Sequence, residues 1–236
     1  MQGVMLPGKI IDALDKTSRN FIWGSSVEKR KLHTVSWEKI TKPKKEGGLG
    51  VTAARPKNVA LLAKLNWRMH VEKDQNWAKV MRSKYTNPKR PCSRTWSAIK
   101  KGQDVFNKGS KWLVGGNSNL KFWHDKWLSE GPLRNMIIGP LNRGEDQLQV
   151  KDMILDGMWN LQRISFDLPS VVGRTIGAIP IPISPYTLDC ISWAYSPSGN
   201  FDGKSAYRIA KGEGGEAGFF EGKWIWKVDT LPKIQC

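Results

Sequence analysis

The stretch FIWGSSVEKRKLHTVSWEKITKPKKEGGLGVTAARPKNVALLAKLNWRM, residues 21–69, decides how the rest of the chain is organised. It carries the aromatic anchors Phe21, Trp23, Trp37 and Trp67, with basic residues around them, and a Gly-Gly-Leu-Gly break between two helical patterns. Aromatic side chains provide packing or stacking surfaces, and Lys and Arg provide charge for a phosphate backbone. The stretch therefore predicts basic helices and raises nucleic acid as a candidate partner.

The net charge of +17 is concentrated in one segment of the chain. Residues 28–111 hold 22 basic and 6 acidic side chains, whereas residues 1–27 hold 3 and 2, and residues 112–236 hold 13 of each. A basic excess on one segment is typical of a nucleic-acid-binding surface. The alternative is a solvated basic face without a partner.

Helical spacing of apolar residues predicts a helix from Pro7 to Gly24, with its apolar face packed on another element, and three further helices at 54–71, 76–85 and 95–106. The three further helices describe a small bundle with apolar stripes inside and basic residues outside. Between the helix at 7–24 and the helix at 54–71, Ser36 either caps a short helix or lies in an alternating strand. The glycine-rich connector at 41–50 lacks the frame of a phosphate-binding loop, and we interpret it as flexible.

The pattern changes after residue 110. The segment KWLVGGNSNLKFWHDKW, residues 111–127, alternates around a Gly-Gly-Asn turn and predicts a β-hairpin. Short helices follow at 150–155, 159–166 and 168–176, a strand at 187–195, and helices at 204–210 and 221–228. The expected fold class is α+β, mainly α: a small basic helical bundle, then a β-hairpin and a mixed, loop-rich second region. The expected domains are 1–108, 109–185 and 186–236.

Cysteine usage and hydropathy bound the class of protein further. Cys92, Cys190 and Cys236 are too far apart for a zinc pattern, and we expect free thiols. No run of about 18 apolar residues occurs, and the N-terminus lacks the plan of a signal peptide. We therefore expect an intracellular protein of the nucleus or cytoplasm. His124 beside Asp125 is either a general-base pair or, as we favour, a surface or packing pair.

Several short motifs follow one another along the chain. They are Asn20-Phe21-Ile22-Trp23-Gly24, Val35-Ser36-Trp37-Glu38-Lys39, Lys42-Pro43, Glu46-Gly47-Gly48-Leu49-Gly50, Ala60-Leu61-Leu62-Ala63-Lys64-Leu65 with Trp67-Arg68, then Trp112, Gly115, Trp123, Asp125 and Trp127, and finally Lys204-Ser205-Ala206-Tyr207 and Trp224-Ile225-Trp226-Lys227. In these motifs the chain resembles the region after the catalytic palm of the reverse transcriptase encoded by plant non-LTR (LINE-type) retrotransposons.

The resemblance implies a thumb-like region, a connection region and the start of the reverse-transcriptase zinc-binding segment, corresponding to the three domains above. It also implies that the chain starts after the fingers and palm and stops before the Cys/His cluster. Polymerisation needs clustered carboxylates that hold two Mg²⁺ ions, and the sequence has no Asp-Asp pair. We therefore expect no enzyme activity, no catalytic residue, no metal site and no cofactor, although the parent family is an RNA-directed DNA polymerase.

In an intact relative, the helices after the palm would grip the backbone of the template–primer. The candidate nucleic-acid-binding residues are basic and lie on or between the predicted helices: Lys29, Arg30, Lys31, Lys42, Lys44, Lys45, Lys57, Lys64, Arg68, Arg82, Lys84, Lys89 and Arg90. They would neutralise phosphates of RNA or DNA with weak sequence preference. Trp37 either stacks on a base or packs in the core. Two alternatives stay open: an RNA- or DNA-binding module exapted from the element, and a decayed open reading frame without function.

Overall fold

The computed structural model describes residues 3–26, 28–85, 91–165, 168–182, 184 and 186–213. Across these residues the chain is mainly helical, with two small antiparallel sheets of two strands each, which confirms the predicted fold class. The described residues form two compact units. The helical unit contains residues up to 69, 74–106 and 203–213, and the second unit contains residues 70–73 and 107–202.

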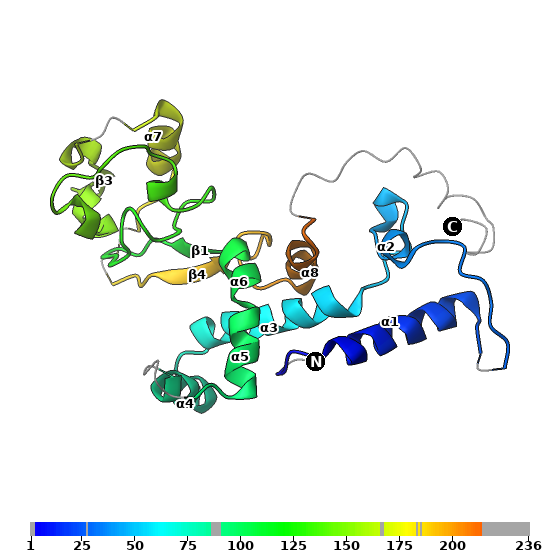
Figure 1. Ribbon diagram of the computed structural model, residues 1–236. Helices are drawn as coiled ribbons and strands as arrows, with labels where there is room; N and C mark the ends of the chain where they lie inside the picture. The colour runs from blue at the N-terminus through cyan, green and yellow to red at the C-terminus, as the bar shows by residue number, and fades with distance from the viewer. Residues whose placement is uncertain are drawn as a thin grey trace. The chain divides into compact units, whose positions relative to one another are not determined.

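The helical unit is built from short and medium helices (Figure 1). In chain order these are α1 (Gly8–Trp23), α2 (Trp37–Ile40), η1 (Lys44–Glu46), α3 (Ala54–Val71), α4 (Asn76–Tyr85), α5 (Arg94–Lys101), the start of α6 (Gln103–Gly109) and α8 (Gly203–Lys211). The predicted helices at 54–71 and 76–85 are confirmed. The predicted helix at 95–106 is divided into α5 and α6 at Gly102.

Local capping explains where several of these helices begin and end. Gly24 ends α1 in a left-handed conformation with φ of 60°, which glycine adopts without steric cost. Ser36 accepts a hydrogen bond from the Lys39 backbone N–H, so the capped-helix alternative for this residue is confirmed. The first N–H group of α3, on Ala54, donates to the Asp15 carboxylate at 2.9 Å. An acid from α1 therefore caps α3 across the fold.

The core of the predicted bundle lies where α3, α4 and α5 meet. Met69, Ala78 and Ile99 are buried there, and the half-buried Leu65, Trp77, Met81 and Trp96 pack around them. Asn66 of α3 is fully buried and donates to the Ile99 carbonyl at 2.6 Å, which ties α3 to α5. The bundle thus combines an apolar centre with a buried polar link through the side-chain N–H of Asn66.

Gly102 marks the closest approach between the α5–α6 junction and α3. A Cβ atom at this position would lie 2.5 Å from both the Leu62 carbonyl carbon and the Ala63 nitrogen. Because both atoms belong to backbone, a side chain here would force the two segments apart. The absence of a side chain therefore lets α5 and α6 cross α3 at short range.

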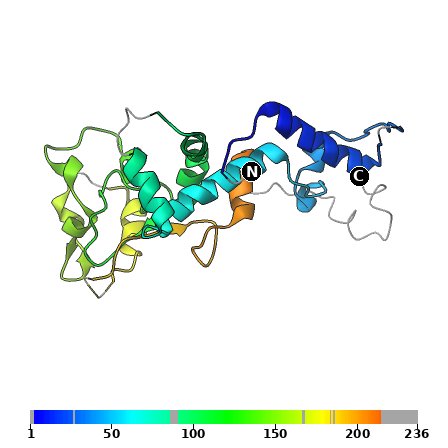
Figure 2. The same cartoon turned by 90° about the horizontal axis from the view of Figure 1, so that it is seen from below.

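α1 lies beside α3 in both views (Figures 1 and 2). The Asn58 side chain of α3 accepts from the Leu6 N–H at 2.9 Å and donates to the Val4 carbonyl at 3.0 Å. Helix α1 itself confirms the predicted helix, but its predicted apolar packing holds only in part. Ile11 is buried, whereas Ile10 and Leu14 are about half exposed and Phe21 is 88% exposed. The residues that α1 uses against α3 include polar ones, such as Asp15.

In the second unit, β1 (Ser110–Leu113) pairs antiparallel with β4 (Cys190–Trp193), with Ser110 opposite Trp193. The predicted hairpin within 111–127 is therefore wrong. Phe122, Trp123 and Trp127 all point into the core, at spacings that an alternating strand does not allow. The predicted strand at 187–195 supplies the partner of β1 instead.

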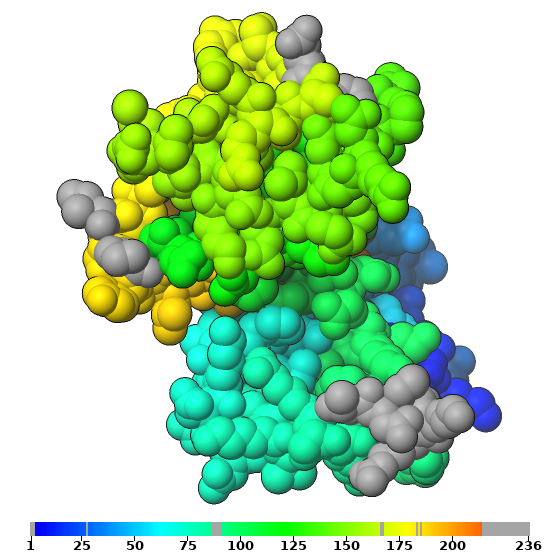
Figure 3. Space-filling view, turned by 90° about the vertical axis from the view of Figure 1, so that its left-hand side faces the viewer, coloured from blue at the N-terminus to red at the C-terminus, as the bar shows by residue number. Residues whose placement is uncertain are grey.

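The remaining elements of the second unit surround one apolar core. They are η2 (Leu133–Asn135), η3 (Glu145–Gln147), η4 (Val150–Met153), the hairpin of β2 (Ile154–Leu155) and β3 (Met158–Trp159), η5 (Leu161–Arg163) and α7 (Ser170–Gly177). Within the described part of the predicted helix at 159–166, only residues 161–163 are helical, as η5. In Figure 3 the green to yellow part of the chain forms a closely packed surface over this core. The predicted helix at 221–228 lies outside the described residues.

Glu145 is a buried carboxylate of the second unit with three hydrogen bonds. It accepts from the backbone N–H and hydroxyl of Ser165 and from the Asn142 N–H, at 2.7, 3.0 and 3.1 Å. Burial disfavours the charged form, but the hydrogen bonds outweigh burial and lower the pKa of the Glu145 carboxyl. Glu145 therefore holds residues 142–145 and 165 together as an anion.

Asp189 anchors the turn that precedes the core segment. Its two carboxylate oxygens accept from the Gly115 N–H at 2.8 Å and from the Asn119 N–H at 3.2 Å. A carboxylate beside β4 thereby fixes the Gly-Gly-Asn turn that follows β1. Of the helices in the described residues, none combines the length and apolar character that a membrane span requires.

Candidate nucleic-acid interface

The first group of predicted basic residues lies on the loop that follows α1. The Ser26 hydroxyl accepts from the Lys29 N–H at 3.0 Å, and the Ser25 hydroxyl accepts from the Lys31 N–H at 3.2 Å. These bonds fold the loop back on itself and leave the side chains of Lys29, Arg30 and Lys31 exposed. A sequence without these serines would not order the loop in this way.

Arg30 and Lys31 help to line a hollow of about 490 Å³ beside α1. Lys16 and His33 contribute to the same hollow, together with Asn20 and the two serines, and none of the described lining residues is a carboxylate. The His33 ring stacks on Trp23, with 6.1 Å between ring centroids. The hollow thus concentrates positive charge at one end of α1, where an anion is electrostatically favoured.

The second group, Lys42, Lys44 and Lys45, lies on the 41–50 connector. This connector is a closed turn, contrary to the interpretation as a flexible segment. The Leu49 N–H donates to the Ile40 carbonyl and the Gly50 N–H donates to the Lys42 carbonyl, both at 2.9 Å. A Cβ on Gly48 would lie 2.1 Å from the Lys42 oxygen, so only glycine fits this close approach.

Lys57, Lys64 and Arg68 lie on α3 and share one helix face. The spacing of seven and four residues places them within about 40° of one another around the helix axis. Lys64 is exposed, and Lys57 and Arg68 are half-buried. The Arg68 guanidinium lies over the Trp77 ring, 5.2 Å from its centroid. Arg68 therefore packs between helices as well as adding charge.

Arg82 and Lys84 serve structural contacts of α4. The Arg82 guanidinium donates to the Met69 carbonyl at the end of α3. The Lys84 amino group lies 5.5 Å from the centroid of the Tyr85 ring. The hydrogen bond with Ser93 and the charge of Lys84 lower the pKa of the Tyr85 hydroxyl. Lys89 and Arg90 lie outside the described residues.

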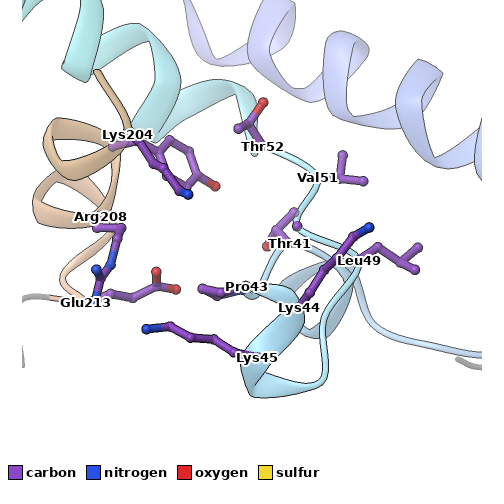
Figure 4. A pocket seen from close by; sticks show the side chains of 12 residues that line it. Thr41, Pro43, Lys44, Lys45, Leu49, Val51, Thr52, Lys204, Arg208 and Glu213 are labelled. Carbon is purple, nitrogen blue, oxygen red and sulfur yellow. The ribbon is translucent and has the colours of Figure 1, made fainter. Parts of the chain in front are cut away.

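The structure brings Lys44 and Lys45 together with α8 around a cleft of about 550 Å³, which we call the basic cleft (Figure 4). Its walls are residues 41–52 on one side and Lys204, Tyr207, Arg208 and Glu213 on the other. Lys45 extends across the cleft toward Glu213, whereas Lys44 turns toward Leu49 (Figure 4). Of the residues that the structure describes, four basic side chains and one acidic side chain line the cleft, which gives this lining a positive charge.

Two long-range hydrogen bonds hold α8 in this position. The Tyr207 hydroxyl accepts from the Ala53 N–H at 3.0 Å, just before α3 begins. The Lys211 amino group donates to the Thr41 carbonyl at 2.9 Å and pairs with Glu213 at 2.7 Å. The cleft therefore has defined walls on both sides.

Lys204, Arg208 and Glu213 were not predicted from the sequence, because they lie in the part of the chain with balanced charge. A signal for the two basic residues is present nonetheless. Lys204, Arg208 and Lys211 recur at spacings of four and three residues, which places them on one side of a short helix. A charge count over long segments averages this local pattern away.

The other candidates from the sequence have structural roles in the described residues. His124 hydrogen-bonds to Asp146 at 2.6 Å, whereas Asp125 accepts from the Lys121 N–H at 2.7 Å. Trp37 is half-buried, and the Arg19 guanidinium lies 6.0 Å from its ring centroid. Among the described residues, no group of three or more His, Cys, Asp or Glu side chains is placed to hold a metal ion.

Comparison with known proteins places the chain among plant proteins. It is 34% identical over 251 residues to a protein of Arabidopsis thaliana named "Putative ribonuclease H protein At1g65750". It is 31% identical over 134 residues to the "Uncharacterized mitochondrial protein AtMg00310" of the same plant. The first alignment covers all of this chain and 40% of the relative, and the second covers 51% of this chain and 84% of the relative.

No protein-family model matches the chain, and no solved structure is significantly similar to it. The two relatives define a class of retrotransposon-derived plant proteins. The chain belongs to this family.

Proposed function

We propose that this chain is a non-catalytic, nucleic-acid-binding part of a LINE-type retrotransposon reverse transcriptase. It corresponds to the thumb-like helical region, the connection and the start of the zinc-binding segment. The helical unit contacts the phosphate backbone of RNA or DNA, and the partner is recognised mainly by charge. Catalysis is left to other parts of such a protein, because the sequence offers no paired aspartates for two-metal chemistry.

The basic cleft is the observation that carries this proposal. Lys44 and Lys45 precede Lys204 and Arg208 by about 160 positions, yet all four line the same space. Collecting like charges is electrostatically unfavourable unless an anion offsets it. The hollow beside α1, with Lys16, Arg30 and Lys31, supplies a second group of positive charge in the same helical unit. The negatively charged phosphates of a nucleic acid backbone match the charge of both the basic cleft and the hollow beside α1.

The family supports a nucleic-acid partner as well. The name of the first relative refers to ribonuclease H, an activity on nucleic acid, and the chain spans 40% of that relative. The second relative has no activity in its name, and the chain spans 84% of it. We take from this the class of partner alone, and we assign binding rather than cleavage to the residues of this chain.

Fluorescence anisotropy of labelled single-stranded RNA and duplex DNA tests the proposal. The purified chain is titrated between about 50 and 200 mM salt. A protein that neutralises about six phosphates loses roughly a thousandfold in affinity over this range. A folded chain that binds neither probe at the lowest salt would refute the proposal and would favour a decayed reading frame.

Matched variants locate the binding surface. The triple variant Lys45→Ala, Lys204→Ala and Arg208→Ala removes three charges from the basic cleft. The control variant Lys121→Ala, Arg143→Ala and Arg174→Ala removes three exposed charges from the second unit. The cleft variant is expected to flatten the slope of log affinity against log salt by up to about 2.7 for duplex DNA. The control is expected to leave the slope unchanged.

A further inference from the structure

Glu213 is the one carboxylate among the described residues that line the basic cleft. Its Oε1 atom pairs with the Lys211 amino group at 2.7 Å, and its backbone N–H donates to the Arg208 carbonyl at 3.0 Å. Its side chain is 22% exposed. Glu213 is therefore anchored at the end of α8 and presents its carboxylate toward the cleft (Figure 4).

The second carboxylate oxygen, Oε2, makes no hydrogen bond to any described residue and is shielded from solvent. A shielded carboxylate oxygen without a donor is unfavourable, because it has lost water and gained nothing in exchange. The Nε atom of Arg208, on the same wall, is also shielded and without a partner among the described residues. This wall of the cleft therefore leaves one acceptor and one donor unsatisfied.

A nucleic acid strand offers different groups to these two atoms. Phosphate oxygens accept hydrogen bonds, so they suit Arg208 and Lys45, but a carboxylate repels them. The Glu213 oxygen needs a donor. The sugar of RNA carries a donor at every nucleotide, the 2′-hydroxyl, and the sugar of DNA carries none within the strand. The terminal torsion of glutamate is broad, so a modest rotation turns Oε2 toward the cleft.

We propose that Glu213 makes the basic cleft selective for ribose over deoxyribose, by accepting a hydrogen bond from a 2′-hydroxyl while Lys45 and Arg208 hold the adjacent phosphates. The inference rests on the proposed nucleic-acid binding and adds to it a residue that sets specificity. Glu213 weakens binding of any strand through its charge, and only RNA recovers part of that loss through the hydrogen bond.

The test compares single strands of one sequence made as RNA, DNA and 2′-fluoro RNA, in anisotropy titrations at one low salt concentration. The wild-type chain is expected to bind RNA roughly tenfold more tightly than DNA, as one hydrogen bond to a charged group allows. The 2′-fluoro strand lacks the donor and is expected to bind like DNA. Tight binding of the 2′-fluoro strand would overturn the inference and would point to strand shape or base amino groups.

Two substitutions of Glu213 separate charge from hydrogen bonding. Glu213→Ala removes both and is expected to raise DNA affinity and bring the RNA-to-DNA ratio close to one. Glu213→Gln removes the charge but keeps an acceptor oxygen, so affinity for both strands rises and a preference of several-fold for RNA remains.

An unchanged ratio in Glu213→Ala, or equal wild-type affinity for RNA and DNA with a steep salt dependence, would overturn the inference and leave the proposed function intact. Failure of the wild-type chain to bind either strand would overturn both.

Discussion

Gly102 offers a sharp test of the helical packing, because alanine there should destabilise the fold although alanine usually stabilises helical segments. A Cβ atom would approach the Leu62 carbonyl carbon and the Ala63 nitrogen to 2.5 Å, about 1 Å inside ordinary contact. The α3 backbone cannot rotate away as a flexible side chain would. Overpacking of this kind costs about 1–3 kcal/mol.

The matched control is Gly173→Ala in α7. A Cβ atom at Gly173 would meet no heavy atom within 4 Å, and the residue lies inside a helix with ordinary backbone angles. Alanine is expected to stabilise the second unit there by about 0.5–1 kcal/mol. The same chemical change therefore has opposite signs at the two positions.

Urea unfolding followed by tryptophan fluorescence and far-ultraviolet circular dichroism measures both variants. With a slope of about 2 kcal/mol per molar urea, a loss of 2 kcal/mol lowers the midpoint by about 1 M. Hydrogen exchange at α3 amides is expected to speed up in Gly102→Ala and to stay unchanged in Gly173→Ala. A Gly102→Ala protein as stable as the wild type would refute the close crossing of α3 by the α5–α6 junction.

Three further predictions follow from contacts described above. Asp189→Ala removes both acceptors of the turn after β1, and is expected to lower the stability of the second unit by about 2–3 kcal/mol in urea unfolding, with Asp189→Asn intermediate. Glu145→Gln is expected to destabilise the second unit at pH 7. The folded state lowers the pKa of Glu145, so its contribution to the free energy of unfolding is complete above the unfolded pKa of about 4.3. This contribution is lost as the pH falls through the folded pKa. Between pH 7 and low pH, the wild-type protein is therefore expected to lose stability more steeply than Glu145→Gln. Arg30→Ala combined with Lys31→Ala is expected to weaken binding of single-stranded RNA and to flatten the slope of log affinity against log salt by up to about 1.4. The urea midpoint is expected to stay unchanged. An unaltered slope would exclude the hollow beside α1 from the interface.

The helices of the basic segment were predictable because local signals agree with tertiary structure there. In α3, the apolar and basic residues recur at helical spacing. The prolines at 88 and 91, shortly after α4, indicate in the sequence that the helix ends there. Such agreement makes both the ends and the buried faces readable from sequence. For α1, the spacing of the apolar residues predicted the helix but not its packing. This part of the chain is held to α3 by hydrogen bonds of Asp15 and Asn58, and Phe21 is left exposed.

The second unit was harder to predict because its contacts are long-range. The alternation after Lys111 has the period of a strand, yet the pairing partner of β1 lies about 80 residues further on. The turn that ends β1 is fixed by Asp189, which no local pattern links to Gly115. The basic cleft escaped prediction for the same reason, since long-range hydrogen bonds of Tyr207 and Lys211 bring its two walls together.

Because α8 contacts Ala53 and Thr41, the ribosome completes the two walls of the basic cleft at different times. Residues 107–202 are synthesised after one wall of the basic cleft and before the other. At about 5–20 residues per second, a ribosome leaves the N-terminal end of α3 without its Tyr207 contact, 154 residues further on, for roughly 8–30 s. A nascent chain that ends before residue 203 contains most of the positive charge but only half of the cleft. Messages cut short in this interval would therefore yield a basic polypeptide without the acceptor that we assign to selecting ribose.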